Sequence, residues 1–177
     1  RRVSGLLWQH PGETPEQTAR QFIEANPRLL AVPVDALKFE DTEQTRTRTA
    51  VTFSHTVDGL QVLDSEVKVL LDSAMNVVAV ISSLRPVTGR VTNPVDIGWD
   101  AAFSAAFAHL YPGLNLDENH PTAHRRLLTR KFIYATHGGV HTVYRVAMPG
   151  LVPTEKTECL VDSATGKILR TRKLVVR

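Results

Sequence analysis

The chain has 177 residues, 42% of them apolar, and 21 lysine and arginine residues stand against 18 acidic residues, which gives a formal net charge of +3. No run of about 18 apolar residues occurs, so we expect no membrane-spanning helix, and we expect any export signal to lie ahead of Arg1. The single cysteine, Cys159, excludes an internal disulfide and a cysteine-based zinc cluster.

The first predicted element is a helix that begins at Pro15. Thr14 supplies an N-terminal cap, proline suits the first helical position, and Gln17 completes a capping box. The helix is predicted to end at Asn26, because a residue that precedes proline avoids helical geometry. Its apolar face consists of Ala19, Phe22 and Ile23.

Antiparallel strands are predicted next. Arg48 to Val57 and Leu60 to Leu71 alternate apolar and polar residues on either side of Asp58-Gly59, a pair that is typical of a tight hairpin turn. A third strand, Val77 to Leu84, follows a turn at Asp72 to Asn76.

The segment from Pro86 to Asp96 contains two prolines and a glycine and is typical of a linker. We therefore place a domain boundary there and divide the chain into modules 1–88 and 89–177. In the second module Trp99 to Leu110 predicts a helix with one strongly apolar stripe. Further strands are predicted at about Leu127 to Thr136, Val140 to Met148, Glu158 to Asp162 and Lys167 to Val176.

A sequence echo indicates that the two modules share one plan. Leu70 to Ala74 resembles Leu160 to Ala164 at a constant offset of 90 residues, and each stretch lies where a strand enters a turn. Asp72 and Asp162 are predicted to accept hydrogen bonds from backbone amides in those turns. The predicted fold class is α+β, with two modules that each pack a helix on a curved antiparallel β-sheet.

The sequence lacks the patterns of common catalytic and metal sites. His120 with His124 and His137 with His141 have the spacing of zinc ligands, but neither pair has the accompanying glutamate, and neither segment is predicted to be helical. Both pairs are predicted to be solvent-facing loop and turn residues. No serine nucleophile elbow occurs, and the position of Cys159 in a predicted strand favours a buried, inert thiol. We expect no catalytic residue, no metal and no cofactor.

Basic residues cluster at Arg125-Arg126, at Arg130-Lys131 and between Arg170 and Arg177. These clusters lack the interleaved aromatic residues that stack nucleic-acid bases, and they are predicted to form a solvated sheet face. We therefore expect neither nucleic acid nor a membrane as a partner.

One hairpin carries a family resemblance. Phe53 to Val62, followed by Ser65-Glu66, resembles the hairpin of the fungalysin/thermolysin propeptide (FTP) domain, which reads Phe-x-Gln-x-Tyr-x-Gly-x-Pro-Val, then a small residue and glutamate. The positions that agree are Phe53, Gly59, Val62 and Glu66, and those that depart are His55, Val57 and Gln61.

The second half looks like a PepSY domain. Trp99 to Leu110 corresponds to its helix, Tyr144 to Val146 to its middle strand, and Leu160 to Leu169 to its terminal hairpin. That hairpin follows the Val-Asp-Ala-x-Thr-Gly-Lys pattern of the family around Asp162 and Gly166. The two motifs occur in the order found in propeptides of secreted thermolysin-like and fungalysin-like proteases.

The resemblance implies a non-catalytic propeptide, part of a zymogen, that acts as intramolecular chaperone and inhibitor of a secreted zinc metalloprotease. It implies a secreted or periplasmic location, a cognate thermolysin-like or fungalysin-like protease domain as the partner, and a protease half that follows Arg177. Thermolysin-like clefts prefer bulky apolar side chains, so we predict that the C-terminal segment leads into the active-site groove. An ordinary last strand of the sheet is the alternative. The candidate contact residues are Arg172, Lys173, Leu174, Val175, Val176 and Arg177.

Two other classes of function stay open. The first is a free-standing extracellular or periplasmic PepSY-type module that binds peptides or peptidases, and a reading frame that continues after Arg177 into a His-Glu-x-x-His motif would distinguish the propeptide from it. The second is a nucleic-acid-binding protein that uses the basic strands, which predicts a steep loss of affinity as salt rises.

Overall fold

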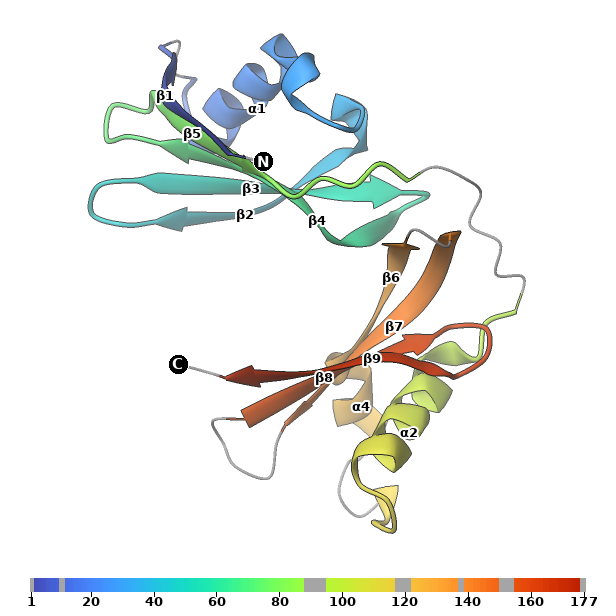
Figure 1. The fold of residues 1–177 in the computed structure, drawn as a ribbon. Helices are drawn as coiled ribbons and strands as arrows, with labels where there is room; N and C mark the ends of the chain where they lie inside the picture. The colour runs from blue at the N-terminus through green and yellow to red at the C-terminus, as the bar shows by residue number, and fades with distance from the viewer. Residues whose placement is uncertain are drawn as a thin grey trace. The chain divides into compact units, whose positions relative to one another are not determined.

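The computed structural model describes residues 2–9, 12–87, 95–116, 122–136, 139–149 and 155–175. The chain divides into two compact units, Arg1–Val87 (unit 1) and Thr88–Arg177 (unit 2). Nine strands and few helices within the described residues make this an α+β chain (Figure 1), and the strand pairings recorded inside each unit are antiparallel. No helix among the described residues is long and apolar enough to cross a membrane.

Unit 1 combines one α-helix with a sheet. Strands β2 to β5 pair in chain order, and β1 adds to the outer edge of β5, which gives the strand order β1-β5-β4-β3-β2. Its elements are β1 (Arg2–Trp8), α1 (Pro15–Ala25), the short 3₁₀ turns η1 (Pro27–Leu29) and η2 (Val34–Ala36), β2 (Leu37–Gln44), β3 (Thr49–Val57), β4 (Leu60–Leu71) and β5 (Val77–Ser82).

Helix α1 begins and ends as the sequence predicts. The hydroxyl oxygen of Thr14 accepts a hydrogen bond from the backbone N–H of Gln17 (3.2 Å), and the side-chain oxygen of Gln17 accepts one from the backbone N–H of Thr14 (3.2 Å). This capping box satisfies amide groups that the first helical turn leaves unpaired. The helix ends at Ala25, ahead of Asn26-Pro27, as proline requires.

The apolar face of α1 packs on one face of the unit 1 sheet (Figure 1). Removing this apolar surface from water stabilises the unit by roughly 25 cal/mol for each Å² buried. The guanidinium of Arg20 extends from the helix over the ring of Phe53, 5.0 Å from its centroid. The buried core residues include Ala19, Phe22, Ile23, Val51, Phe53, Val67, Val69, Leu71 and Val77.

The turn between β3 and β4 consists of Asp58 and Gly59, whose φ angles are both positive, at 50° and 77°. Two successive positive φ angles are typical of the type I′ turn, whose twist matches that of the paired strands. A Cβ added at Gly59 would meet no atom within 4 Å, so glycine is required there by the backbone conformation and not by crowding. The tight turn predicted from Asp58-Gly59 is confirmed.

Unit 2 has a related order of elements. Its strands pair in chain order, β6-β7-β8-β9, so each unit contains a helix followed by four strands that pair in the order in which they occur. The elements are α2 (Gly98–Leu110), α4 (Thr122–Leu128), β6 (Thr129–Thr136), β7 (Gly139–Pro149), β8 (Glu155–Asp162) and β9 (Ile168–Val175).

Helix α2 packs on the unit 2 sheet through the apolar stripe that the sequence predicts. Just ahead of the helix, the carboxylate of Asp96 accepts hydrogen bonds from Tyr144 (2.9 Å) and Lys131 (2.6 Å) on the sheet. Burial of the Tyr144 hydroxyl, together with its bond to Asp96, raises the pKa of Tyr144 to about 12. The core cluster that α2 forms with the sheet includes the buried residues Ala102, Phe103, Ala106, Phe107, Tyr144, Val146, Met148, Cys159 and Val161.

The prediction for one segment of unit 2 is wrong. Residues Thr122–Leu128 form the helix α4, so the expectation that the segment of His124 is not helical, and the predicted start of a strand at Leu127, both fail. Alanine, arginine and leucine favour a helix at these positions. The apolar pair Leu127-Leu128 is typical of a strand only when it is buried, whereas Leu127 is 80% exposed. The strand begins at Thr129.

The substitution Gly59→Val should lower the free energy of unfolding of unit 1 by about 1–2 kcal/mol, because a β-branched residue disfavours positive φ. Gly59→Asn is the matched control, since asparagine tolerates the left-handed region and should cost much less. Urea denaturation followed by the fluorescence of Trp8, which packs on Phe22 in unit 1, measures the effect. Equal stability of the valine variant and the native chain would contradict the turn geometry.

Candidate functional site

The predicted protease-contact segment begins within β9, the last strand of unit 2. Arg172 and Lys173 are exposed on this strand, and Leu174 is half-buried. Val175 is the last residue of β9, while Val176 and Arg177 lie outside the described residues. Residues 172–175 are thus part of the sheet, and their contact with a protease stays a prediction.

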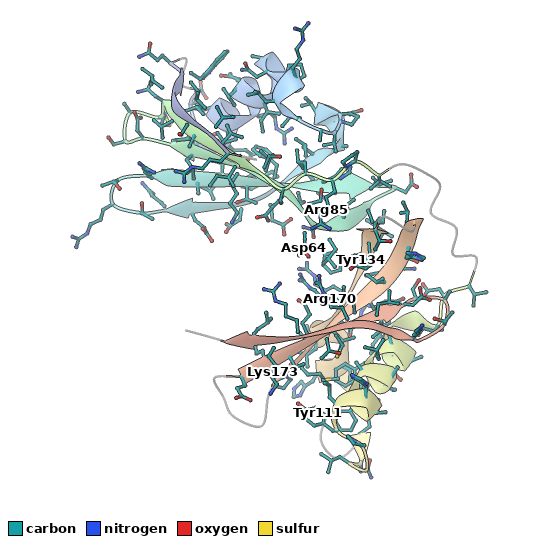
Figure 2. All side chains as sticks on the ribbon, in the orientation of Figure 1. Asp64, Arg85, Tyr111, Tyr134, Arg170 and Lys173 are labelled. Atoms are coloured by element: carbon teal, nitrogen blue, oxygen red, sulfur yellow. The ribbon has the colours of Figure 1, made fainter. Side chains whose placement is uncertain are left out.

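Strand β9 pairs with β8, and within the described part of unit 2 no other strand pairs with it. One edge of β9 therefore presents backbone N–H and C=O groups to its surroundings. Because successive residues of a strand point to opposite faces, Arg170 and Arg172 share one face and Lys173 lies on the other. Figure 2 shows Arg170 and Lys173 on either side of the β9 ribbon. Thr171, on the face of Lys173, contacts His109 of α2 (3.3 Å), so this is the face that α2 covers.

On the sheet face opposite α2, one carboxylate holds two arginine side chains. Glu158 of β8, whose side chain is 12% exposed, forms ion pairs with Arg170 (3.3 Å) and Arg145 (3.8 Å). The guanidinium of Arg145 lies 4.5 Å from the centroid of the Phe132 ring, and that of Arg170 lies 6.0 Å from the centroid of Tyr134. Figure 2 shows Arg170 and Tyr134 near each other. Ion pairs and cation–π contacts together hold these cations in defined positions. We call Arg145, Glu158 and Arg170 the Glu158 cluster.

The sequence alone did not identify the Glu158 cluster. Its members come from three strands, and Arg145 and Glu158 become neighbours only through the pairing of β7 with β8, which places Arg145 opposite Leu160. Glu158 lies opposite Arg172 in the β8–β9 register. Had this register been predicted, the two opposite charges facing each other across the strands would have indicated a charged cluster around Glu158.

Aromatic rings lie beneath several basic side chains, although the basic clusters of the sequence lack interleaved aromatic residues. Arg126 lies over Trp99 (5.5 Å) and Lys131 over Tyr144 (5.7 Å), and these rings come from distant segments of the chain. Arg125, expected on a solvated face, is instead 5% exposed and forms an ion pair with α2. The solvated-face interpretation is therefore wrong for Arg125.

The turn between β8 and β9 is organised by Asp162. One carboxylate oxygen of Asp162 accepts hydrogen bonds from the backbone N–H groups of Ala164 (3.0 Å) and Thr165 (2.8 Å) and from the Thr165 hydroxyl (2.9 Å). Burial acts to raise the pKa of Asp162, but these hydrogen bonds outweigh it and leave the pKa below its ordinary value. Gly166, with φ of 73°, completes the turn. The predicted role of Asp162 is confirmed.

The corresponding turn of unit 1 has the same design. Asp72 accepts hydrogen bonds from the backbone N–H groups of Ala74 and Asn76 (both 2.9 Å) and from the Asn76 side chain (3.0 Å), and the bonds from Asn76 lower its pKa. Met75, with a φ of 60°, comes just before Asn76, whose carbonyl oxygen closes the turn. Gly166 holds the equivalent place in unit 2, just before Lys167. The sequence echo thus corresponds to one turn design in both units.

The residues that match the FTP motif shape a hairpin and do not converge on one site. Phe53 is fully buried and Val62 is 1% exposed, while Gly59 forms the turn. The Glu66 carboxylate lies near the surface and pairs with Lys68 at 3.7 Å. The fold of the hairpin therefore explains why these residue types occur at these positions. Contact of these residues with a partner is untested.

A buried serine–histidine pair lies in unit 1. The hydroxyl oxygen of Ser65 is 3.3 Å from Nδ1 of His55 and accepts the backbone N–H of Arg85 (2.9 Å). Such a pair is one part of a nucleophilic site, but the two residues are only 2% and 3% exposed, which closes them to a substrate. Burial lowers the pKa of His55, against a backbone hydrogen bond with Arg85 that raises it. The geometry fits a structural hydrogen bond.

The thiol of Cys159 is fully buried on β8, where the sequence predicts it. Burial raises the pKa of the Cys159 thiol, which disfavours the reactive thiolate. Among the described residues, no group of three or more histidine, cysteine, aspartate or glutamate side chains is placed to hold a metal ion. His124 lies on α4 and His141 on β7, while His120 and His137 lie outside the described residues.

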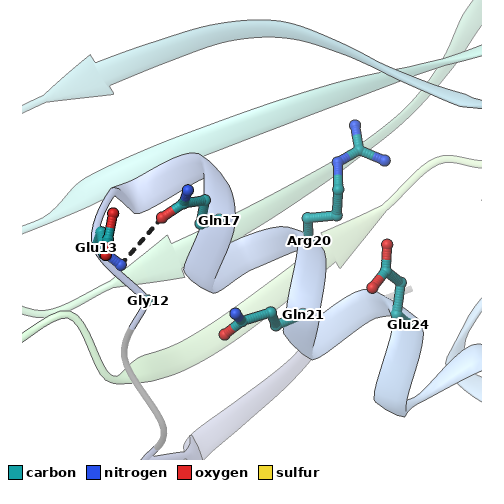
Figure 3. Close-up of a pocket in the computed structure, with 6 residues that line it drawn as sticks. All are labelled: Gly12, Glu13, Gln17, Arg20, Gln21 and Glu24. Atoms are coloured by element: carbon teal, nitrogen blue, oxygen red, sulfur yellow. Dashed lines mark hydrogen bonds between the residues drawn. The ribbon is translucent and has the colours of Figure 1, made fainter.

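A shallow, open pocket of about 560 Å³ lies along the polar face of α1 (Figure 3). Its lining mixes both signs of charge. The Glu13 backbone N–H donates a hydrogen bond to the side chain of Gln17 (3.1 Å), so part of its polar surface is already satisfied. The lining residues are Gly12, Glu13, Gln17, Arg20, Gln21 and Glu24.

No protein family matches the chain, and no curated protein matches it. Solved structures that are similar to it include the following two. The C-terminal domain of YpeB from Bacillus megaterium has 14% sequence identity and a TM-score of 0.48, with 95% of this chain and 68% of that chain covered. A candidate lipoprotein from Clostridium difficile 630 has 13% identity and a TM-score of 0.32, with 97% and 100% covered. We infer no function from similarities of this size.

The substitution Asp162→Ala should lower the free energy of unfolding of unit 2 by about 1–2 kcal/mol, because it removes the acceptor of three hydrogen bonds in one turn. Asp162→Asn keeps a side-chain oxygen there and should cost less. The difference in the free energy of unfolding between the native chain and Asp162→Asn should shrink as the pH falls below 3.8, where aspartate in the unfolded chain becomes protonated. Urea denaturation followed by Trp99 fluorescence gives both quantities, and equal stability of all three chains would refute the role of Asp162.

Acidification should destabilise unit 1 through His55. The pKa of His55 is lowered in the folded state, so the unfolded state binds the proton more readily and the free energy of unfolding falls as the pH drops below 6.5. His55→Gln should remove this part of the pH dependence. Melting temperatures between about pH 8 and pH 5 test this. An unchanged slope in His55→Gln would contradict it.

Proposed function

We propose that the chain is the non-catalytic propeptide of a secreted zinc metalloprotease of the thermolysin or fungalysin kind. In this proposal residues 1–88 are an FTP-like module and residues 89–177 a PepSY-like module, each a helix packed on a curved antiparallel sheet. The propeptide binds the protease domain, assists its folding and inhibits it in the zymogen. Its location is secreted or periplasmic.

The exposed edge strand at the end of unit 2 carries this proposal. Strand β9 ends with the apolar residues Leu174 and Val175, and Val176 follows them in the sequence. These residues suit a cleft that prefers bulky apolar side chains. The edge of a sheet also offers main-chain hydrogen bonds to a partner, as in many peptide complexes. A chain that continues from a rigid sheet into a groove loses little conformational entropy on binding.

The rest of the chain supports a binding function. The two helices bury apolar cores, so each sheet can present a fixed surface. A surface that binds the native-like protease more tightly than the unfolded protease stabilises the native state of the protease by mass action. In this way a propeptide assists folding. The buried state of the Ser65–His55 pair and of Cys159 supports a non-catalytic role.

The purified chain should inhibit thermolysin, and removal of residues 173–177 should weaken inhibition by about tenfold or more, equivalent to about 1.4 kcal/mol of binding. Hydrolysis of a chromogenic peptide by thermolysin, titrated with each variant, measures the inhibition constant. The truncated chain must keep its melting temperature, because the deletion also shortens β9.

A matched control is Leu127→Asp, which removes an exposed apolar side chain from α4, far along the chain from the deleted residues. This variant should inhibit as the native chain does. Unchanged inhibition by the truncated chain would refute the role of the C-terminal segment. A native chain that neither inhibits nor binds thermolysin-like or fungalysin-like enzymes, together with a reading frame that ends without a His-Glu-x-x-His motif, would overturn the proposed function.

A further inference from the structure

The outer edge of β9 is a place where the unit 2 sheet can accept another strand. Strand β9 pairs with β8 from Ile168 to Val175, and no second neighbour occurs within the described part of unit 2. Residues 171–173 on this strand are exposed. Backbone N–H and C=O groups along the other edge are therefore available to an extended segment.

Unit 1 has a strand in the equivalent place. Strand β1 pairs antiparallel with the outer edge of β5, with Arg2 to Ser4 opposite Ala79 to Ile81. Strands β5 and β9 correspond, because each is the last of four strands that pair in chain order and each follows a turn held by an aspartate, Asp72 or Asp162. The position that β1 fills in unit 1 is one that none of the described strands of unit 2 fills.

The charge of β9 determines which segment fits. Arg172 and Lys173 are exposed on opposite faces of the strand, and within the described residues neither forms an ion pair. Arg170 adds a cation on the face of Arg172 and shares Glu158 with a second arginine. An added strand therefore meets positive charge on both of its faces, and acidic side chains pair favourably across it.

The same charges disfavour other occupants. Charged residues on an edge strand commonly prevent uncontrolled pairing, and the β9 strand of a second copy would bring like charges together. An acidic strand is attracted where a basic one is repelled. The charge of the basic residues therefore favours an acidic occupant of the edge over a basic one.

We propose that the outer edge of β9 binds an extended acidic segment of a partner protein, which adds to the unit 2 sheet as an antiparallel strand. Main-chain hydrogen bonds provide affinity, and Arg172 and Lys173 provide the preference for acidic residues. This inference specifies the chemistry of the segment that the partner contributes. It rests on the proposed function only if that partner is identified as the protease. Its test needs no protease.

The probe is a capped, fluorescently labelled heptapeptide, Val-Glu-Glu-Val-Glu-Glu-Val, which places glutamate on both faces of a strand. Titration with the full chain at low ionic strength, followed by fluorescence anisotropy, should show saturable binding. The double variant Arg172→Glu/Lys173→Glu should weaken binding by about tenfold or more. Arg46→Glu/Arg48→Glu changes the net charge equally in an exposed turn of unit 1 and should stay within about twofold of the native chain.

Two further peptides separate backbone pairing from charge. A version N-methylated at alternate residues keeps its charge but loses N–H donors, and it should bind about tenfold more weakly or worse. The lysine analogue, Val-Lys-Lys-Val-Lys-Lys-Val, should not bind. If the double variant does not fold, binding of the glutamate peptide to the native chain should still weaken as NaCl rises from about 0.05 to 0.5 M.

Equal binding of the N-methylated peptide would overturn strand addition, and equal binding of the lysine peptide would overturn the acidic preference. Self-association in sedimentation experiments that the double variant abolishes would identify a second copy as the occupant, through the acidic edge strand β2, and would overturn the assignment to a separate partner. Peptide binding by a chain that does not inhibit thermolysin would support this inference and count against the proposed function.

Discussion

Helix α1 covers one face of the unit 1 sheet, and α2, whose core Leu128 of α4 also joins, covers one face of the unit 2 sheet. The burial of these faces limits what the other residues can do. The ring of Phe53 under α1 and that of Phe103 within α2 are both fully buried, so neither core offers a reactive surface. What remains for contact with other molecules is the uncovered face and the edges of each sheet. In unit 2 both of these carry arginine side chains, on the uncovered face in the Glu158 cluster and along β9.

Elements whose ends are set by local chemistry were predictable from the sequence. Strand β4 has the predicted bounds because a turn residue fixes each end, Gly59 ahead of it and Asp72 after it. Strands β1 and β2 were not predicted, because an edge strand is held by pairing with one neighbour and its side chains need not alternate. All residues of β2 after Leu37 are exposed, so the sequence has no burial pattern there to detect.

The candidate site was only partly predictable. Arg172 and Lys173 were singled out through a family resemblance, but their place at an edge depends on which strands pair, and a single strand's sequence does not contain that information. The Glu158 cluster requires the register of three strands. The rings beneath Arg126 and Lys131 likewise come from segments that only the fold brings together.

The position of Cys159 makes the integrity of the C-terminal edge chemically measurable. This thiol, the one cysteine of the sequence, lies directly opposite Thr171 of β9, with no surface exposed and with a pKa that burial raises. An alkylating reagent can reach it only when β9 separates from β8 or the covering helix lifts, so the rate of alkylation reports how often the sheet opens there. The reactivity of Cys159 thus measures the separation of β9 from β8, and any ligand that stabilises this strand pair should slow the alkylation.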